Sequence, residues 1–383
     1  MFVRPTWAEI DLDAIADNAR AIKEILPAGT KMMAVVKANG YGHGALQVAE
    51  IALQHGVEYL GVAAADEGIE LREAGITAPI LILGYTPNDC ADAVVAYGLT
   101  QTVFTSELLS ALNEAALRRG RRAKVHLKVD TGMGRLGLTD LDEAVDFAQR
   151  AMDMPGILLE GVYTHFATSD ELDSPYAEEQ IDRFAELQQR LQQAGLNIPY
   201  RHISNSAGIL QYGDAPGNLV RLGLSLYGYY PSQEIPKGVE LKHVLRFVSQ
   251  VVQLKEVPAG TKISYGATFE TKVPSLIATV PVGYADGYSR LLSNRGEALV
   301  RGVRVPVIGR VCMDQLMLDV TGVEGVASGD EVVLYGKQGD DEISLDEVAE
   351  KIGTISYEVC CALGRRVPRL YQQRGKTIQI RTM

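Results

Sequence analysis

The chain has few cysteines and no long apolar run, and both absences narrow what it can be. Its four cysteines, Cys90, Cys312, Cys360 and Cys361, form neither a CxxC pair nor a spacing suited to zinc. We therefore expect reduced thiols, a reducing compartment and no bound metal. No stretch approaches the roughly 20 apolar residues that span a bilayer, and the first residues lack the basic-then-apolar order of a signal peptide. These absences predict a cytoplasmic protein without a membrane anchor.

The chain also has fewer positively charged than negatively charged residues. The 383 residues include 37 Lys and Arg against 48 Asp and Glu, which gives a net charge of −11. Such a balance argues against the basic surface by which proteins hold nucleic acid or anionic membranes, so small soluble molecules are the expected partners. Hydrophobic residues make up 46% of the chain and charged residues 22%, as in globular proteins. The length suggests about two domains.

Residues 32 to 228 alternate short, β-rich apolar runs with stretches of helical period. Strands that alternate with helices indicate βα units and a parallel sheet, and eight such strands indicate a closed (β/α)8 barrel of the TIM type. An open doubly wound sheet fits less well because it usually has fewer strands. The eight runs are MMAVV, YLGVA, PILIL, TVF, VHLKV, ILLEGVYT, YRHIS and VRLGLSLYG.

The helical period disappears after about residue 240, where apolar and polar residues alternate and turn residues recur every few positions. This pattern predicts a mostly antiparallel β domain. The polar segment PSQEIPKG, with two prolines, is the expected junction, so we predict a barrel domain over 1–238 and a β domain over 239–383. The first run, TWAEIDL, is ambiguous: residues 1–12 either open the barrel or pair with the β domain.

The ends of the barrel strands identify candidate site residues, because barrel enzymes place their reactive groups there. The mouth so formed is cationic, with one imidazole and no cluster of carboxylates. It suits an anionic ligand and argues against metal-assisted hydrolysis or a glycosidase acid pair. The strand-end residues are Lys37, Tyr41, Leu83, Lys128, Arg135, His165, Asn205, Ser206, Arg221 and Gly223.

Lys37 has the most suggestive position of these residues. It directly follows the apolar run AVV and precedes a loop that contains Gly40, Gly42 and Gly44. Burial in a barrel mouth and neighbouring cations both lower the pKa of a lysine, which favours Schiff-base formation. The glycines let a ligand approach the backbone closely. The competing interpretation is a surface lysine whose charged end extends into water.

Two loops after the last barrel strands offer a phosphate site. They are SNSAG (204–208) and RLGLSLYG (221–228), which provide the Ser206 hydroxyl and the backbone N–H groups of Gly223 and Leu224. An ordinary helix cap explains the same residues. In the β domain, strand-to-loop junctions carry a few large side chains, and packing at strand ends accounts for them equally well.

Taken together, these segments resemble the bacterial alanine racemases, a family of pyridoxal-phosphate enzymes. The resemblance runs in order from about residue 6 to about residue 371 and covers both predicted domains. The motifs that carry it are AVVKANGYGHG, HLKVDTGMGRLG, YTHFATSD, SNSAG, VRLGLSLYG, ISYGATF, GYADG and GRVCMDQ.

The resemblance implies a homodimer in which each site is built by two subunits. Lys37 would bind pyridoxal 5'-phosphate as a Schiff base and act as one catalytic base, while Tyr265 of the other subunit acts as the second. The implied cofactor-binding residues are Lys37, Tyr41, Leu83, His165, Asn205, Ser206, Arg221, Gly223, Leu224 and Tyr357. Arg135 would bind the substrate carboxylate, with Met313 and Tyr265 reaching in from the other subunit. Lys128, often carbamylated in the family, would hold Arg135, and Asp170, Tyr284 and Arg290 would line the substrate access corridor.

The chemistry of racemisation explains why these residue types are needed. The cofactor supplies an electron sink for the α-carbon, and inversion then requires bases on opposite faces. A phenol with a pKa near 10 is a poor base at neutral pH, so His165 and Arg221 are candidates to favour the ionised form of Tyr265. Arg221 cannot take a proton from the pyridine nitrogen, so the ring stays neutral. We expect a short-lived carbanion that is reprotonated rather than transaminated.

Other functions fit parts of the sequence. A non-catalytic pyridoxal-phosphate carrier of the same barrel type would explain Lys37 and the phosphate loops, but it does not need the β domain. The sequence distinguishes poorly between an alanine racemase and a racemase for serine or for a broader set of amino acids. An amino-acid decarboxylase usually places a carboxylate at the pyridine nitrogen, which Arg221 contradicts. The family's usual role predicts D-alanine supply for peptidoglycan.

Overall fold

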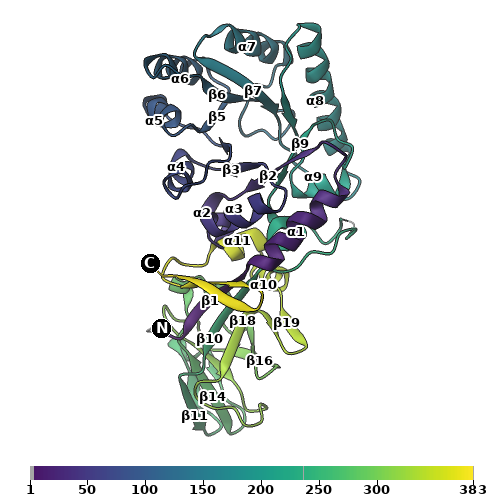
Figure 1. Cartoon of the computed structure of the whole chain (residues 1–383). Coiled ribbons are helices and arrows are strands. Elements are labelled where there is room, and N and C mark those ends of the chain that lie inside the picture. Colours follow the sequence, from purple (N-terminus) through teal and green to yellow (C-terminus); the bar gives the residue numbers. More distant parts are fainter. Residues whose placement is uncertain (1–3, 236, 383) are drawn as a thin grey trace. The chain divides into compact units, whose positions relative to one another are not determined.

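The computed structural model describes residues 4–235 and 237–382, so residues 1–3 of the predicted first strand region and Pro236 of the predicted junction lie outside it. This part of the chain forms two compact units (Figure 1). The barrel unit comprises Ala14–Gly40 and Ala45–Lys242. The sheet unit comprises the residues up to Asp13, the short segment Tyr41–Gly44 and the residues from His243 onwards.

The barrel unit contains a parallel sheet of eight strands, in the order β8-β7-β6-β5-β4-β3-β2-β9. The two terminal strands are joined by backbone hydrogen bonds from Asn218 N to Arg201 O (2.9 Å) and from Arg221 N to Ser204 O (3.0 Å), which close the barrel. The predicted (β/α)8 fold is therefore confirmed. The strands are β2 (Lys31–Val35), β3 (Tyr59–Val62), β4 (Ile80–Ile82), β5 (Thr100–Val103), β6 (Ala123–Lys128), β7 (Ile157–Tyr163), β8 (Tyr200–His202) and β9 (Leu219–Leu222).

Amphipathic helices cover the outside of this barrel (Figure 1). In one of them, α7, Asp140 caps the first turn by accepting hydrogen bonds from Asp142 N and Glu143 N, and the apolar face buries Phe147. The helices are α1 (Leu12–Ile25), α3 (Ala45–Gln54), α4 (Ala65–Glu73), α5 (Ala91–Ala96), α6 (Ser106–Arg118), α7 (Leu141–Asp153), α8 (Pro175–Gln193) and α9 (Ser206–Gln211). A further short segment, α2 (Lys37–Tyr41), has backbone angles that are not those of a right-handed helix.

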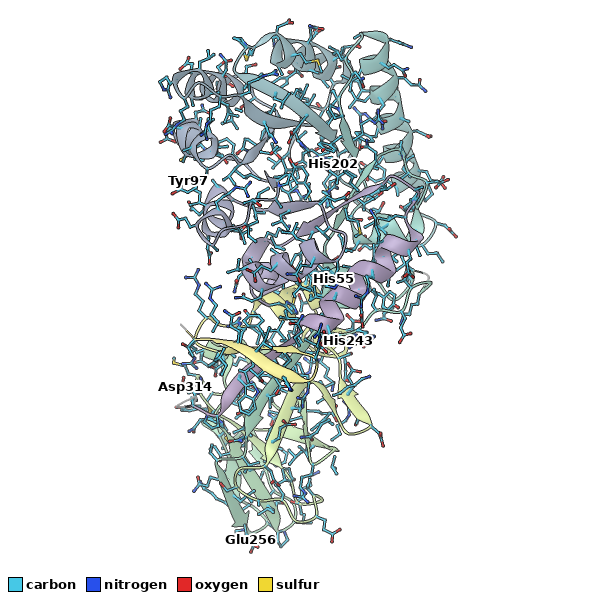
Figure 2. The ribbon with its side chains drawn as sticks, viewed as in Figure 1. His55, Tyr97, His202, His243, Glu256 and Asp314 are labelled. Carbon is cyan, nitrogen blue, oxygen red and sulfur yellow. The ribbon has the colours of Figure 1, made fainter. Side chains whose placement is uncertain are left out.

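The inside of the barrel is only partly apolar. Met33, Tyr59, Leu81 and Leu219 form a buried cluster contributed by four strands. Because side chains alternate along a strand, other inward positions carry buried polar groups, among them His126 and Lys128 on β6, His202 on β8 and Arg221 on β9. His202 lies among the barrel strands in Figure 2. Buried polar groups need partners, and their contacts organise the site described below.

The sheet unit is built on a sheet in the order β11-β14-β17-β16-β15-β18-β10-β1-β20-β21, with β19 paired to β18. Its first strand, β1 (Thr6–Asp11), pairs antiparallel with β10 and parallel with β20, so this early segment lies in the C-terminal sheet. The remaining pairs in the sheet are antiparallel. The predicted mostly antiparallel β domain is therefore confirmed.

The segment SLDEVAEKIG of this unit contains the helix α10, whose first turn is capped by Ser344. The sequence patterns did not predict α11, which is only six residues long, nor the last hairpin, β20 to β21. The strands are β10 (Leu245–Gln250), β11 (Gln253–Val257), β12 (Lys262–Ile263), β13 (Phe269–Glu270), β14 (Ser275–Val280), β15 (Glu297–Val300), β16 (Val303–Ile308), β17 (Leu316–Asp319), β18 (Glu331–Gln338), β19 (Asp341–Ile343), β20 (Arg369–Gln373) and β21 (Lys376–Arg381), and the helices are α10 (Leu345–Ile352) and α11 (Ser356–Cys361). Among the described residues, no helix has the length and apolar character needed to cross a membrane.

Candidate active site

Lys37 begins an unusual turn at the end of β2. The backbone after it is left-handed, with φ of 52° at Ala38, 53° at Asn39 and 61° at Gly40. A residue with a side chain loses roughly 1–2 kcal/mol in this conformation, so the surrounding structure must hold the turn. The glycine-rich loop therefore has a second role besides letting a ligand approach the backbone, because it reverses the direction of the chain directly after Lys37.

Glu67 on α4 is one of the groups that hold this turn. Its Oε1 accepts a hydrogen bond from Ala38 N at 2.6 Å, and its Oε2 accepts one from Ala63 N at 2.7 Å. On the other side, the Tyr227 hydroxyl donates to Val35 O at 3.0 Å, at the end of β2. Glu67 is not among the site residues that the sequence predicts. Its only local signal is its position in the first turn of a helix, where a glutamate commonly bonds backbone N–H groups.

Arg221 in the barrel mouth contacts four groups through its guanidinium. It is 3% exposed, and its Nη2 donates to Ile203 O at 2.7 Å and to Thr164 O at 3.0 Å. Nη2 also lies 2.9 Å from His165 Nδ1, and Nη1 lies 2.9 Å from His202 Nδ1. Burial lowers the pKa of Arg221 to about 10, which leaves it protonated at neutral pH. Because arginine has no acceptor, both histidine Nδ1 atoms must accept these hydrogen bonds.

His165 is consequently a neutral imidazole whose proton is on Nε2. Burial lowers its pKa well below the usual value, and the charges of Arg221, Arg135, Lys128 and Lys37 lower it further. This electrostatic influence places Lys37 among the cations that act on one imidazole at the mouth.

Lys128 at the end of β6 is buried and donates to Val129 O at 2.9 Å. Its Nζ lies 5.2 Å from the centre of the Tyr163 ring. Burial lowers the pKa of Lys128 to about 7, and Arg221 also acts in that direction, whereas Asp130 opposes it. The amine is therefore neutral in a large fraction of molecules near physiological pH. Arg135 is exposed, and its backbone N–H is bound by Asp130 Oδ2 at 3.0 Å.

The loops that follow β8 and β9 meet through Ser206. Its Oγ accepts hydrogen bonds from Gly223 N at 3.0 Å and from Ser225 N at 3.3 Å. Asn205 caps α9 by accepting from Gly208 N at 2.9 Å. Leu224, between the two bonded residues, is buried. The two predicted phosphate loops thus lie together, and Asn205 performs the capping role that the sequence analysis left as an alternative.

The remaining predicted residues of the barrel unit are less constrained. Leu83 follows β4 and packs beside the buried interior cluster, and its carbonyl accepts a hydrogen bond from the Tyr163 hydroxyl at 3.2 Å. Asp170 lies exposed in the loop between β7 and α8.

Tyr41 and Tyr357 are neighbours within the sheet unit. Their ring centres are 6.1 Å apart, and burial raises the pKa of Tyr41 well above the usual value. Gly42 next to Tyr41 has φ of +82°, and a Cβ atom there would lie 2.4 Å from Cys360 O. Only glycine therefore lets this loop pack against α11. Tyr357 has no signal in the sequence apart from the family resemblance.

Tyr265 stands on a short 3₁₀ turn and is 72% exposed. Ser264 before it adopts a positive φ of 64°, and its Oγ donates to Arg310 O at 2.7 Å, which helps to hold this backbone conformation. Ser264 Oγ also lies 3.5 Å from Cys312 Sγ, which connects the turn to the loop that carries Met313. Met313 is 53% exposed. Two large side chains are thus displayed on a surface of constrained backbone.

A third loop completes this surface. Tyr284 N donates to Cys312 O and Ala285 N to Met313 O, both at 3.1 Å. Asp286 holds this loop in place. Its fully buried carboxylate accepts a hydrogen bond from Gly283 N at 2.9 Å and forms ion pairs with Arg4 and Arg366. The sequence analysis missed Asp286, because its two arginine partners are far away along the chain. Arg290 lies nearby in sequence on an exposed 3₁₀ turn.

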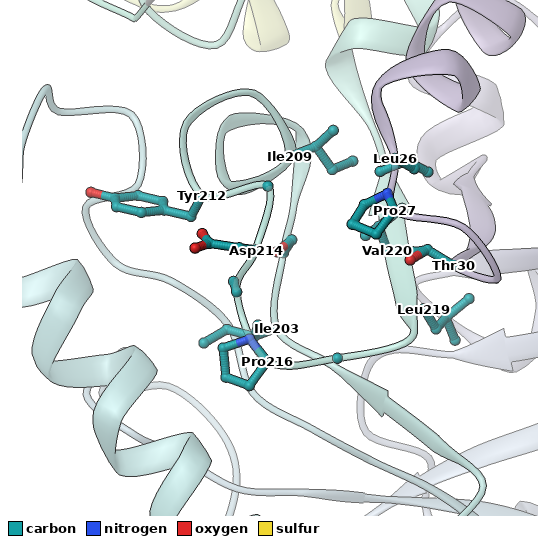
Figure 3. Close-up of a pocket in the computed structure, with 14 residues that line it drawn as sticks. Leu26, Pro27, Thr30, Ile203, Ile209, Tyr212, Asp214, Pro216, Leu219 and Val220 are labelled. Carbon is teal, nitrogen blue, oxygen red and sulfur yellow. The ribbon is translucent and has the colours of Figure 1, made fainter.

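A hollow of about 280 Å³ elsewhere in the barrel unit contains none of the predicted site residues (Figure 3). Its walls come from the residues before β2, from the chain between β8 and β9, which includes α9, and from the start of β9, with Asp214 as the one charged side chain among those that line it. Within the described residues, no group of three or more His, Cys, Asp or Glu side chains is arranged to hold a metal ion.

Comparison with known proteins gives a consistent result over nearly the whole chain. Residues 10–231 match the family "Alanine racemase, N-terminal domain" and residues 244–371 match "Alanine racemase, C-terminal domain". Alanine racemase 2 of Caldanaerobacter subterraneus subsp. tengcongensis is 50% identical over 379 residues, covering 99% of this chain and 98% of that protein. Among solved structures, alanine racemase of Clostridium difficile 630 has a TM-score of 0.95 at 40% identity, covering 100% of this chain and 99% of that one. The Bacillus anthracis enzyme with bound L-Ala-P has a TM-score of 0.93 at 41% identity, covering 100% and 98%.

Proposed function

This chain belongs to the alanine racemase family, and we propose that it interconverts L-alanine and D-alanine with two opposing bases, Lys37 and Tyr265 of a partner subunit. Family membership makes it a pyridoxal 5'-phosphate-dependent isomerase. The observation that supports the two-base arrangement is the division of the predicted bases between two compact units. Lys37 lies in the barrel mouth, whereas Tyr265 lies largely exposed on a constrained turn of the sheet unit.

The residues of the barrel mouth fit the cofactor. Lys37, Arg135 and Arg221 act as cations there, and Lys128, with a pKa of about 7, is charged in only part of the molecules. An excess of cations at this mouth suits a phosphate-bearing ligand. We propose that Lys37 holds the cofactor covalently and that Arg221 faces its ring nitrogen. The phosphate would be bound by Ser206, the N–H groups of Gly223 and Leu224, and the hydroxyls of Tyr41 and Tyr357.

When bound, pyridoxal phosphate supplies the electron sink that makes the α-hydrogen of an amino acid acidic. Lys37 would move that proton on one face of the substrate and Tyr265 of the partner subunit on the other, with Lys37 serving the D-enantiomer. His165 supports the second step, because its Nδ1 accepts from Arg221 and its Nε2 is left as a donor. A hydrogen bond donated to the phenolate of the partner's Tyr265 would favour the ionised form of that base.

Arg221 and Arg135 would have separate binding roles. Arg221 is fixed by carbonyl and imidazole acceptors and does not release its proton, so it keeps the ring nitrogen unprotonated. Arg135 would bind the substrate carboxylate. Lys128 would hold Arg135 after reacting with carbon dioxide, since its pKa of about 7 leaves a neutral, nucleophilic amine. Asp170, Tyr284 and Arg290 would line the access corridor, and Met313 of the partner subunit would border the substrate.

Subunit mixing tests the shared site. Lys37→Ala and Tyr265→Phe should each abolish racemisation, but a re-paired equimolar mixture should recover about one quarter of wild-type activity, since half of the dimers are mixed and each contains one complete site. Each variant alone, carried through the same unfolding and refolding, is the control. A mixture that stays inactive would contradict the shared site.

A heavy-water assay tests the reaction itself. Holoenzyme incubated with L-alanine in deuterium oxide should produce D-alanine that carries deuterium at Cα. Deuterium without inversion would mean that only one face has a working base. Absence of both would favour the non-catalytic carrier, and faster turnover of serine would favour a related racemase. We further propose that the D-alanine serves peptidoglycan synthesis.

A further inference from the structure

A row of neighbouring polar side chains crosses the interior of the barrel from Arg221. His202 Nδ1 lies 2.9 Å from Arg221 Nη1, and His202 Nε2 lies 2.9 Å from His126 Nδ1. His126 Nε2 in turn lies 3.6 Å from Glu160 Oε1. The two imidazoles are fully buried, and Glu160 is 8% exposed. The row links the candidate active site with a carboxylate that the proposed reaction does not use.

The chemistry of the donors fixes the direction of every hydrogen bond in this row. Arginine only donates, so His202 Nδ1 accepts and the proton of His202 is on Nε2. That proton is donated to His126 Nδ1, which places the proton of His126 on Nε2, facing Glu160. If His202 were protonated on both nitrogens, its Nδ1–H group would face an N–H group of the Arg221 guanidinium, which is unfavourable. Burial lowers the pKa of both histidines, and Arg221 lowers that of His202 further, so both are neutral.

The far end of the row is a well-supported anion. Glu160 Oε1 accepts hydrogen bonds from the Tyr59 hydroxyl at 2.6 Å and from Thr100 Oγ1 at 3.1 Å. Lys124 Nζ, partly exposed, lies 3.7 Å from Oε2. Burial alone would raise the pKa of Glu160, but the nearby His126, the hydrogen bond from Tyr59 and the charge of Lys124 outweigh it and keep the pKa below the usual value. A positive charge and a negative charge therefore stand at the two ends of a polarised row.

The backbone is adapted to hold these groups. The pairing of β6 with β7 shifts register between Val125 and His126, so that Glu160 is the extra residue of a bulge. A Cβ atom at Gly161 would lie 2.3 Å from His126 Nδ1, so the imidazole occupies space that only glycine leaves. The Tyr163 ring stacks on His202 with centres 4.5 Å apart and planes 2° from parallel. Both histidines are thus held in one orientation by packing.

We infer that His202, His126 and Glu160 are positioning residues that set the orientation of Arg221. The inference rests on the proposed function only in assigning Arg221 to the ring nitrogen. The row does not conduct protons to the site, because the arginine at its end does not release one. Its effect is to give Nη1 a fixed acceptor, so that the guanidinium keeps the orientation in which it excludes a proton from the ring nitrogen.

Nitrogen NMR tests the row without reference to activity. The chain has six histidines, so holoenzyme labelled with ¹⁵N in the imidazole rings gives few signals, which single-histidine variants assign. We expect His202 and His126 to be neutral with the proton on Nε2 throughout pH 7 to 9. The groups that face them are Arg221, Lys128 and Tyr163 around His202, and Glu160, Lys124, Tyr59 and Tyr200 around His126. Titration of either ring, or a proton on Nδ1, would overturn the inference.

Two substitutions at one position separate positioning from packing. The side-chain oxygen of asparagine can replace Nδ1 as the acceptor for Arg221, whereas the amide of glutamine replaces Nε2 and reaches only His126. With cofactor labelled by ¹⁵N at the ring nitrogen, we expect His202→Asn to keep that nitrogen unprotonated, as in wild type. We expect His202→Gln to shift its signal toward the protonated form and to raise the fraction of turnovers lost to transamination about tenfold, as loss of one hydrogen bond to a charged group implies.

Equal spectra and equal side-product fractions in the two variants would overturn the positioning role. If the wild-type holoenzyme fails to racemise alanine, the proposed function fails, but the histidine tautomers and the ring-nitrogen signal still decide the inference. If neither His202 variant folds, the wild-type histidine spectrum alone decides it.

Discussion

Asp286 offers a quantitative test of how the surface that carries Tyr265, Met313 and Tyr284 is held. Its carboxylate is fully buried and accepts hydrogen bonds from Arg4 Nη2 at 2.6 Å, Arg366 Nε at 2.7 Å and Gly283 N at 2.9 Å. Asp286→Asn keeps the shape of the side chain but removes its charge and turns one acceptor into a donor. The variant therefore tests the ion pairs with little change in packing.

The expected loss of stability follows from these contacts. Breaking a buried ion pair by removing one partner costs about 3–5 kcal/mol. Arg4 and Arg366 are about one third exposed, so water solvates part of the charge that is left, and we expect a loss of about 2–3 kcal/mol. Burial raises the pKa of Asp286, but the bonds from Arg4 and Arg366 outweigh it and lower the pKa below 3.8.

The pH dependence follows from this direction. Because the pKa is lower in the folded state, the stabilisation is complete above the unfolded pKa and is lost as the pH falls through the folded pKa. The cost of Asp286→Asn should therefore be constant between about pH 5.5 and pH 8. A cost that changes sharply within that range would contradict the assignment.

The assay uses the single tryptophan of the chain, Trp7, which lies in β1 of the sheet unit. Its fluorescence during urea unfolding reports the unit that contains Asp286. Asp314→Asn is the matched control, because Asp314 also binds Arg366 but is 57% exposed. We expect a cost below about 1 kcal/mol for this exposed pair. Equal shifts for the two variants, or a shift below about 0.5 kcal/mol for Asp286→Asn, would refute the reasoning.

Three further outcomes are expected at the barrel mouth. Glu67→Gln should lower kcat about tenfold, because an amide N–H would face a backbone N–H at the Lys37 turn. The control Asp66→Asn, which changes an exposed neighbour, should leave kcat unchanged. Similar kcat values for the two variants would count against the role of Glu67. Arg221→Glu should raise the yield of transamination products, measured as the ratio of keto acid to D-alanine formed. An unchanged ratio would contradict the proposed role of Arg221 at the ring nitrogen. With ¹³C-bicarbonate, NMR should detect a carbamate that Lys128→Ala lacks and that weakens as the pH falls below about 7, because protonation removes the nucleophilic amine; persistence of the signal in Lys128→Ala would place it elsewhere.

Much of this organisation is encoded locally and was predictable from the sequence. Alternation of apolar runs with helical periods reports which faces of each element are buried, and this determines eight βα units and a separate β domain. Strand ends place Lys37, His165 and Arg221 at one mouth, because parallel strands share their carboxyl edge. The roles of Tyr265 and Tyr357 came from resemblance to a family, since nothing local distinguishes them from tyrosines that only pack.

Other features depend on groups that are distant in sequence, and only the tertiary structure decided them. The pairing of β1 with β10 and β20 depends on strands more than two hundred residues away. The row from Arg221 to Glu160 requires a bulge in β7, the space above Gly161 and the side-by-side placement of four strands. Proton positions on His165 and His202 follow from a shared arginine partner. The periodicity of the sequence indicates whether a side chain is buried. Which side chain it contacts inside the barrel is decided by closure of the barrel.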